Sequence, residues 1–361
     1  MLSYLNASNA LAILKKEKTM KLFQIILLIL LPSAIFANDD RPPIDYDFLA
    51  KKETRAFINQ MVKKHGFARN DLTKILKNAK LDRDTLARYT GKFKKNSTVG
   101  TWQRFKAHTL DPVSLDMALT FSKKYDRILK KAAKEYQVDA EYIVGFIGVE
   151  SKFGSFSGDY RLLDSLATLA FHPNRMQKFF TNELEHFFLM CQEEGFDPLT
   201  LEGSFAGAMG VVQQMPSIYR KYGMDYNGDG KKDPWSAEDG IGIIARFMNQ
   251  KGWVSGAQVA VKASYKEKRF NALKTGFKTS HTLTTLKKNG IASKEKFAYK
   301  RAMLIKLYDK ESDELWLAGP NFRVLTKYNP SSNYAMAIHK IAQHVKTHST
   351  QEKTWFQTLF E

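Results

Sequence analysis

The sequence predicts a mainly helical protein of the α+β class, with a small mixed domain inserted late in the chain. Apolar residues recur at spacings of three and four over residues 48–92 and 111–200, which is the helical period. Residues 255–318 are instead rich in lysine and contain two short β-favouring pieces, AQVAVKAS and ELWLAG. Because the chain has 361 residues and is 43% hydrophobic, it has enough material for a large core and more than one domain.

The patterning predicts five parts. Residues 1–37 form an N-terminal extension and signal peptide, and 38–108 an N-terminal helical region, with a polar linker near its end. Residues 109–254 form the main helical core, 255–318 the inserted α+β domain, and 319–361 a return to the core. Within the core, residues 111–138 form a long amphipathic segment with a helical pattern. Asp139 and Asp164 stand where the next two helices should be capped, and a further helix starts near Ala237.

Residues 20–37 have the pattern of an export signal, and residues 1–19 are interpreted as an upstream extension, with Met20 as the expected start. Lys21 precedes the apolar run LFQIILLILLPSAIFA, and small residues up to Ala37 precede polar sequence. This arrangement predicts cleavage after Ala37 and export to the periplasm. The alternative is a retained membrane anchor, although the run is shorter than the roughly 20 residues of a full span and contains Pro32. No cysteine lies beside the predicted cleavage site, so a lipid anchor there is excluded.

The chain is strongly basic, with 56 lysines and arginines against 37 acidic residues. Such a balance indicates an anionic polymer or surface as partner. Nucleic acid fits poorly with an export signal, whereas an anionic cell envelope fits well. The one cysteine, Cys191, lies in a helical apolar pattern and cannot form an internal disulfide, so we interpret it as a core residue.

The stretch EYIVGFIGVESKFG places a carboxylate, Glu150, at the end of an apolar segment. Burying an unpaired charge is costly. One interpretation is that the helix simply reaches solvent at this point. The other is a general acid, because an apolar cleft raises the pKa of a carboxyl group and keeps it protonated near neutral pH. The segment alone leaves both interpretations open.

The stretch DYNGDGKKDPWS resembles a calcium-binding loop. Oxygen ligands are expected at alternating positions, with Gly230 allowing the sharp turn. The twelfth position holds Ser236 rather than the usual glutamate, which predicts weak binding. The alternative is a turn held by side-chain hydrogen bonds, with Ser236 capping the next helix and Asp239 as its capping partner. The predicted metal ligands are Asp225, Asn227, Asp229 and the carbonyl of Lys231.

Six motifs follow one another along the chain: GVESKFG, LLDSLATLAF, GSFAGAMGVVQQMP, DYNGDG, NQKGW and NFRVLTKYNPSSNYAMAI. In these motifs the sequence closely resembles the lytic murein transglycosylase B family over residues 49–254 and 319–345, and only weakly over 255–318. The resemblance implies a lysozyme-like helical core with an inserted smaller domain. It also implies an enzyme, a carbon–oxygen lyase that cleaves peptidoglycan between N-acetylmuramic acid and N-acetylglucosamine.

The resemblance implies that Glu150 is the single catalytic group. It would protonate the glycosidic oxygen and then take the proton of the sugar's own 6-hydroxyl as that oxygen attacks C1. The product is a 1,6-anhydro sugar. Ordinary glycosidases use two carboxylates, but here the substrate supplies the nucleophile, so no second carboxylate is assigned. Two alternatives are a muramidase-type hydrolase and a non-catalytic peptidoglycan-binding scaffold.

The resemblance also implies a set of substrate-binding residues and several departures from the family pattern. Val211-Val212 stands where the family has a tyrosine-glycine pair, Gln214 replaces an aromatic residue, and both phenylalanines of the set stand where tyrosines are common. These changes bear on substrate preference rather than on the acid. The implied substrate-binding residues are Ser204, Gln213, Tyr328, Asn329, Tyr334, Arg175, Phe105 and Phe247.

The chemistry so inferred requires no cofactor, and Ca²⁺ would be structural. The expected partners are peptidoglycan glycan strands, together with cell-wall synthesis or division proteins and peripheral contact with a membrane. No nucleic-acid partner is expected, and we expect a monomer.

Overall fold

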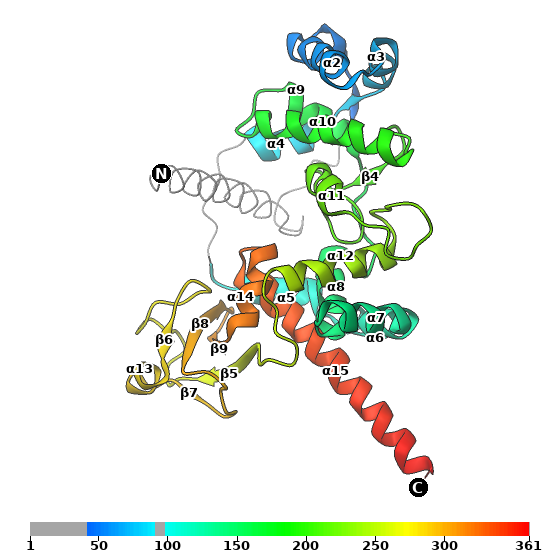
Figure 1. Ribbon diagram of the computed structural model, residues 1–361. Coiled ribbons are helices and arrows are strands. Elements are labelled where there is room, and N and C mark those ends of the chain that lie inside the picture. The colour runs from blue at the N-terminus through cyan, green and yellow to red at the C-terminus, as the bar shows by residue number, and fades with distance from the viewer. Residues whose placement is uncertain (1–41, 91–97, 361) are drawn as a thin grey trace, which may run out of the picture. The chain divides into compact units, whose positions relative to one another are not determined.

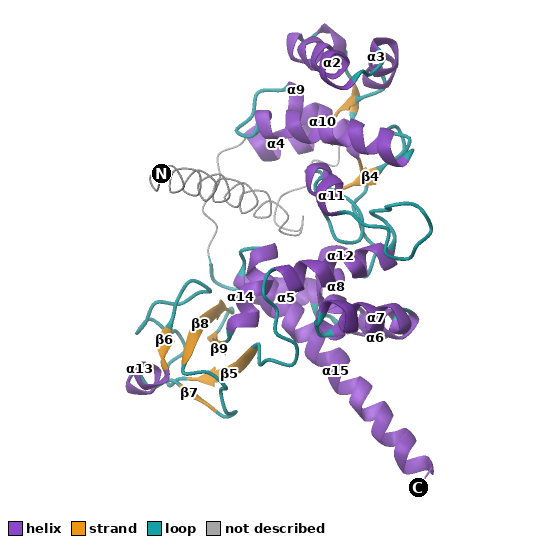
Figure 2. Ribbon diagram, viewed as in Figure 1, coloured by secondary structure: helices purple, strands orange, loops and turns teal. Residues whose placement is uncertain are grey.

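The computed structural model describes residues 42–90 and 98–360 (Figure 1). The predicted signal peptide and most of the predicted linker lie outside these residues. The described chain is mainly helical with small sheets (Figure 2), which confirms the predicted fold class. It divides into two compact units: one contains Thr98–Phe105 and Lys251–His339, and the other contains the described parts of Ala37–Ser97, Lys106–Gln250 and Lys340–Glu361. No helix within 42–90 or 98–360 is long and apolar enough to span a membrane.

The second unit holds most of the helices. Helices α9 and α10 pack together, with α4 against α9 and α11 against α10, while α12 packs on α7 and α8 and α6 packs on α8. Every residue of α9 is buried. The helices of this unit are α2 (Lys52–His65), α3 (Arg69–Lys77), α4 (Arg83–Thr90), α6 (Pro112–Lys124), α7 (Asp126–Tyr136), α8 (Ala140–Ser151), α9 (Leu162–Phe171), α10 (Gln177–Glu194), α11 (Pro216–Tyr222) and α12 (Ala237–Gln250), with a 3₁₀ turn at Phe48–Ala50.

Several local predictions can be compared with this unit. The amphipathic segment over 111–138 is helical, as predicted, and it consists of two helices, α6 and α7, because the backbone leaves the helical conformation at Tyr125. Ser236 does cap α12, since its Oγ accepts the Asp239 N–H at 3.2 Å. Cys191 is buried in α10, and burial raises the pKa of its thiol to about 12. The interpretation of Cys191 as a core residue is therefore confirmed.

The prediction that Asp164 caps a helix is wrong. Helix α9 begins at Leu162, so the N-cap is Arg161 and Asp164 lies in the first turn. The Asp164 carboxylate instead accepts the Lys80 N–H at 2.7 Å and the Arg161 Nη2 at 2.6 Å. Asp164 thus ties strand β2 (Lys80–Leu81), which pairs with β1 (Ile44–Asp45), to the start of α9.

The first unit contains a five-stranded sheet in the order β6-β8-β9-β5-β7, with every neighbouring pair antiparallel. One face of the sheet carries an apolar cluster that includes Phe270 and Leu286. The longest strand, β8, was not among the predicted β pieces. The elements are β5 (Ala260–Ser264), β6 (His281–Thr282), α13 (Leu283–Lys288), β7 (Ala292–Ser293), β8 (Arg301–Tyr308), β9 (Asp313–Ala318) and α14 (Pro320–Tyr328); helices α5 (Thr101–Thr109) and α15 (Ser332–Phe360) each begin in this unit.

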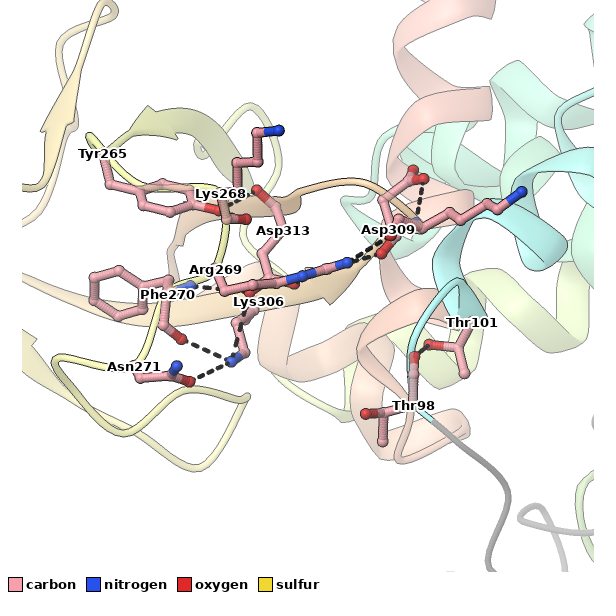
Figure 3. A network of polar contacts seen from close by, with 11 residues as sticks. Thr98, Thr101, Tyr265, Lys268, Arg269, Phe270, Asn271, Lys306, Asp309 and Asp313 are labelled. Carbon is pink, nitrogen blue, oxygen red and sulfur yellow. Dashed lines mark hydrogen bonds and ion pairs between the residues drawn. The ribbon is translucent and has the colours of Figure 1, made fainter.

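A buried carboxylate, Asp313, fastens the loop after β5 to this sheet (Figure 3). Its oxygens accept the Phe270 N–H at 3.0 Å and the Arg269 Nη1 at 2.8 Å. The Lys306 ammonium lies 3.7 Å from the same carboxylate and donates to the Phe270 carbonyl at 2.7 Å. The charge of Asp313 is thus matched by two cations, which is the condition for a buried carboxylate to be tolerated.

A second polar cluster joins α2 to α10. The buried Glu185 carboxylate accepts Gln60 Nε2 at 2.6 Å and Lys64 Nζ at 2.7 Å, and lies 2.8 Å from His65 Nε2. Burial raises the pKa of Glu185, but the hydrogen bonds from Lys64 and His65 lower it by more. The net pKa is therefore below the ordinary 4.5. The ionised form is therefore the one that the fold stabilises.

Replacing this carboxyl in Glu185→Gln should lower the free energy of unfolding by about 1–2 kcal/mol at pH 7, the scale of a charge-assisted hydrogen bond. A depressed pKa gives stability above the unfolded-state value and loses it as pH falls through the folded value. The gap between wild type and variant should therefore close below about pH 4.5. Urea denaturation at several pH values measures the gap, with the exposed Glu202→Gln as control. A gap that does not narrow as the pH falls below 4.5 would contradict the assignment.

Strands β3 (Tyr160–Arg161) and β4 (Glu202–Gly203) pair antiparallel and bring two backbones very close together. At Gly158, where φ is +105°, an added Cβ would lie 2.1 Å from the carbonyl carbon and oxygen of Gly203. Backbone atoms cannot rotate away as a flexible side chain can. Only glycine is therefore compatible with this contact.

The variant Gly158→Ala should lose about 2–4 kcal/mol of stability, because both backbone strain and steric overlap oppose it. Gly195→Ala is a matched control: Gly195 also has positive φ (+73°), but no atom lies within 4 Å of its added Cβ. Strain alone should cost the control about 1–2 kcal/mol. Chemical denaturation of both variants measures the difference, and equal losses would mean that the close approach to Gly203 is unimportant.

Candidate active site

Glu150 lies half-buried in the last turn of α8, a helix whose residues from Tyr142 to Gly148 are all buried. The helix ends at once, because Lys152, Phe153 and Gly154 all have positive φ (46°, 62° and 82°). Two consecutive non-glycine residues in this region are unusual and signal a constrained turn. Glu150 therefore stands where a buried helix gives way to an exposed, sharply reversing loop.

The reversing turn is packed back onto α8. Phe153 lies directly over Gly148, where an added Cβ would be 2.5 Å from the Phe153 ring, and it also contacts Phe121 with ring centroids 5.7 Å apart. On the same helix Phe146 meets the ring of Phe247 edge-on at 6.0 Å. The surroundings of Glu150 on its own helix are thus apolar, as the sequence indicated.

The small-residue segment at 203–215 forms a tight polar loop. The Ser204 Oγ accepts the Ala208 N–H at 3.0 Å, which leaves its hydroxyl hydrogen to be donated. Gln213 is buried, with φ of 48°, and its Nε2 donates to the carbonyls of Ser157 at 2.7 Å and Gly210 at 3.0 Å. A ligand would therefore meet Gln213 through its Oε1 oxygen.

Arg175 lies in the loop between α9 and α10 and is exposed. Its Nη2 donates to the Arg88 carbonyl at 3.0 Å, and its guanidinium carbon stands 4.8 Å from the centre of the Tyr89 ring. These contacts hold the cation against α4 and orient its planar face. An exposed guanidinium held in this way is suited to bind a carboxylate.

The other four predicted substrate-binding residues belong to the first unit. Tyr328 ends α14, Asn329 follows it, and Tyr334 lies in the first turn of α15. The rings of Tyr328 and Tyr334 stack, with centroids 6.5 Å apart and planes 2° from parallel. Phe105 stacks on Trp102 at 6.4 Å. The two tyrosines of the KYNPSSNY motif thus stack within this unit, and the role of the motif in binding substrate stays a prediction.

The predicted calcium-type loop is ordered by its own side chains. Asp225 Oδ1 accepts the N–H groups of Gly228 at 2.7 Å and Asp229 at 3.1 Å, and its Oδ2 accepts that of Gly230 at 2.8 Å. Asn227 Nδ2 donates to Asp229 Oδ2 at 2.9 Å. Within the described ranges, no three His, Cys, Asp or Glu side chains gather as a metal cluster, so side-chain carboxylates alone do not define a metal site.

Sequence reasoning treated Asp239 only as a helix-capping partner, and it missed a second role. Asp239 is fully buried, and its oxygens accept the N–H groups of Tyr226 at 2.7 Å and Asp233 at 2.9 Å. Burial raises the pKa of Asp239, these hydrogen bonds lower it, and the nearby charge of Asp225 raises it again; the net direction is upward. Asp239 is thus a buried carboxylate beneath the loop, electrostatically coupled to Asp225.

Comparison with known proteins supports the resemblance. A family model described as Transglycosylase SLT domain matches residues 50–343. The membrane-bound lytic murein transglycosylase B of Escherichia coli (strain K12) is 39% identical over 306 residues, which cover 83% of this chain and 84% of that protein.

Solved structures agree with this match. The E. coli lytic transglycosylase Slt35 in complex with calcium aligns with a TM-score of 0.75 and 37% identity, covering 85% of this chain and 96% of that one. SltB3 from Pseudomonas aeruginosa in complex with NAG-NAM-pentapeptide aligns with a TM-score of 0.69 and 25% identity, covering 81% and 78%. The predicted lysozyme-like fold class is confirmed, and the chain belongs to the lytic murein transglycosylase B family.

Proposed function

We propose that this protein is a lytic transglycosylase that cleaves the β-1,4 bond between N-acetylmuramic acid and N-acetylglucosamine in peptidoglycan. Family membership supports the reaction class. The assignment of the catalytic role to a residue rests on the position of Glu150. It is a half-buried carboxyl on an apolar helix, at the point where the chain turns out of the core.

In the proposed reaction, the protonated Glu150 carboxyl donates its proton to the glycosidic oxygen as the bond from C1 breaks. The 2-acetamido group of the muramic acid stabilises the positive charge that develops at C1. The 6-hydroxyl oxygen of the same sugar then attacks C1, and the Glu150 carboxylate accepts its proton. Glu150 returns to its starting form, and no water is consumed. One group acting first as acid and then as base is sufficient for this sequence.

The predicted binding residues suggest how the glycan is held. Ser204 offers a hydroxyl donor and Gln213 an amide oxygen, which match the acetamido and hydroxyl groups of a sugar. The exposed guanidinium of Arg175 suits a carboxylate of the stem peptide. Phe247 is proposed to join this set. Phe105, Tyr328, Asn329 and Tyr334, which belong to the first unit, stay predictions from the family resemblance. The partner is accordingly a peptidoglycan strand.

The variant Glu150→Gln removes the titrating proton and keeps the size of the side chain. We expect turnover of purified peptidoglycan to fall between about a hundredfold and ten thousandfold, the usual contribution of general acid–base catalysis. Mass spectrometry of the wild-type digest should give 1,6-anhydro products. Products heavier by one water would instead identify a hydrolase.

Glu141→Gln is the matched control for this experiment. Glu141 lies on the same helix and pairs with Lys346 at 3.4 Å, so its replacement removes a carboxylate without touching the proposed site. The control should retain full turnover. If wild type and Glu150→Gln degrade peptidoglycan equally slowly, the protein is a binding scaffold rather than an enzyme.

We also propose that the protein acts in the periplasm. The predicted export signal, the basic composition and the membrane-bound relative in E. coli support this location. Whether the signal is cleaved after Ala37 follows from the N-terminal residue of the mature protein.

We infer in addition that the loop at 225–239 binds Ca²⁺ weakly. The relative Slt35 has been solved with calcium, and the donor set here is oxygen-rich, as calcium requires. The predicted ligands are Asp225, Asn227, Asp229 and the Lys231 carbonyl, and Asp239 adds a buried carboxylate whose repulsion with Asp225 a cation would relieve. Lys231 itself and Lys232 place positive charge in the same loop and oppose the ion, so we expect a dissociation constant of about 10⁻⁴–10⁻³ M.

Calcium at ten times this dissociation constant should raise the free energy of unfolding by about 1.4 kcal/mol. Asp225→Asn should abolish the increase. Asp197→Asn is the control, because Asp197 is an exposed turn residue outside the loop that accepts the Leu199 N–H. Calorimetry with calcium and with chelator measures the effect; equal calcium responses from wild type and Asp225→Asn would rule out the site.

A further inference from the structure

Ser151, the residue after Glu150, makes the contact that joins the end of α8 to the loop at 203–215. Its side chain is buried, 1% exposed. The hydroxyl oxygen lies 2.8 Å from the Val211 carbonyl and 3.2 Å from the Ile147 carbonyl. A hydroxyl has one hydrogen to donate, and the shorter distance assigns it to Val211, 60 residues along the chain.

The same oxygen accepts a hydrogen bond from the turn that follows Glu150. The Gly154 N–H donates to Ser151 Oγ at 2.9 Å. Gly154 is the third consecutive residue with positive φ, so this bond closes the strained reversal. A single buried hydroxyl therefore fixes both the end of the helix and the turn beyond it.

The Val211 peptide is a firm anchor because it is held from both sides. Its N–H donates to the Pro234 carbonyl at 2.9 Å, while its carbonyl receives the Ser151 hydroxyl. Its side chain fills the space above Gly240 on α12, where an added Cβ would lie 2.4 Å from it. Two residues further on, Gln213 reaches back to the Ser157 carbonyl. The segment 151–157 is thus hydrogen-bonded to the loop at 203–215 through both Val211 and Gln213.

From this geometry we propose that Ser151 is a positioning residue. Its hydroxyl fixes the position of the last turn of α8, and with it the Glu150 carboxyl, relative to the loop that carries Ser204 and Gln213. This inference rests on the proposed function of Glu150. A displacement of about 1 Å between an acid and its substrate costs roughly a hundredfold in rate, so a loss of this positioning should affect the chemical step more than binding.

The test uses Ser151→Ala in the full chain, acting on soluble glycan fragments of alternating N-acetylglucosamine and N-acetylmuramic acid. We expect kcat per folded molecule to fall at least tenfold, while KM changes less than about threefold. Hydrogen exchange of the amides over 209–214 and at Gly154 should become faster, because the Val211 carbonyl and the Gly154 N–H lose their shared partner. A hydroxyl with only a structural role would lower the folded fraction and leave kcat per folded molecule unchanged.

Ser155→Ala is the matched control. Ser155 lies in the same turn, but its Oγ donates only to the nearby Lys152 carbonyl at 2.7 Å and is exposed, so neither kcat nor exchange over 209–214 should change. Wild-type kcat in Ser151→Ala, or unaltered exchange over 209–214, would overturn the positioning role alone. A wild-type chain no more active than Glu150→Gln would overturn the proposed function, and the role of Ser151 with it.

Discussion

Close approach of backbone to backbone is the constraint on which the architecture around Glu150 depends. The loop at 203–215 lies against α9 and α12 with no room for side chains at its glycines. A Cβ at Gly203 would lie 2.3 Å from the Ala208 carbonyl oxygen, and one at Gly210 would lie 1.9 Å from the Pro234 carbonyl oxygen. The small residues are therefore required by packing, before any question of substrate arises. This packing also brings the loop within hydrogen-bond reach of Ser151.

Because the loop is packed so closely, its buried N–H and C=O groups need hydrogen-bond partners within the protein. The loop meets it mostly through its own bonds, such as Met209 N–H to the Gln214 carbonyl at 3.0 Å. The Gln213 and Ser151 side chains supply bonds that the backbone does not. The side chain of Gln213, which the sequence identified as a substrate ligand, thus also makes hydrogen bonds that stabilise the fold. For Gln213, Nε2 serves the fold, and the contact proposed with substrate would be made by Oε1.

Much of this could be predicted from the sequence, and the failures have physical causes. The periodicity located most of the helices. Strand β8 was missed because RAMLIKLY is buried on both faces and lacks the alternation of a half-exposed strand. Asp164 was misassigned because the cap of this helix lies three residues earlier, at Arg161. The hydrogen bond from Ser151 to Val211 could not be predicted at all. Its acceptor is a backbone carbonyl 60 residues away, which a residue of any type would supply.

The backbone contacts of Val211 change the interpretation of one departure from the family pattern. Val211-Val212 replaces a tyrosine-glycine pair and suggested altered sugar contacts. In the structure, however, Val211 acts through its N–H and its carbonyl, which any residue except proline would supply. Its side chain only has to fit above Gly240. At position 211 the bond to the Ser151 hydroxyl thus uses the backbone carbonyl rather than a side chain, so the replacement of tyrosine by valine here is compatible with the proposed positioning of Glu150.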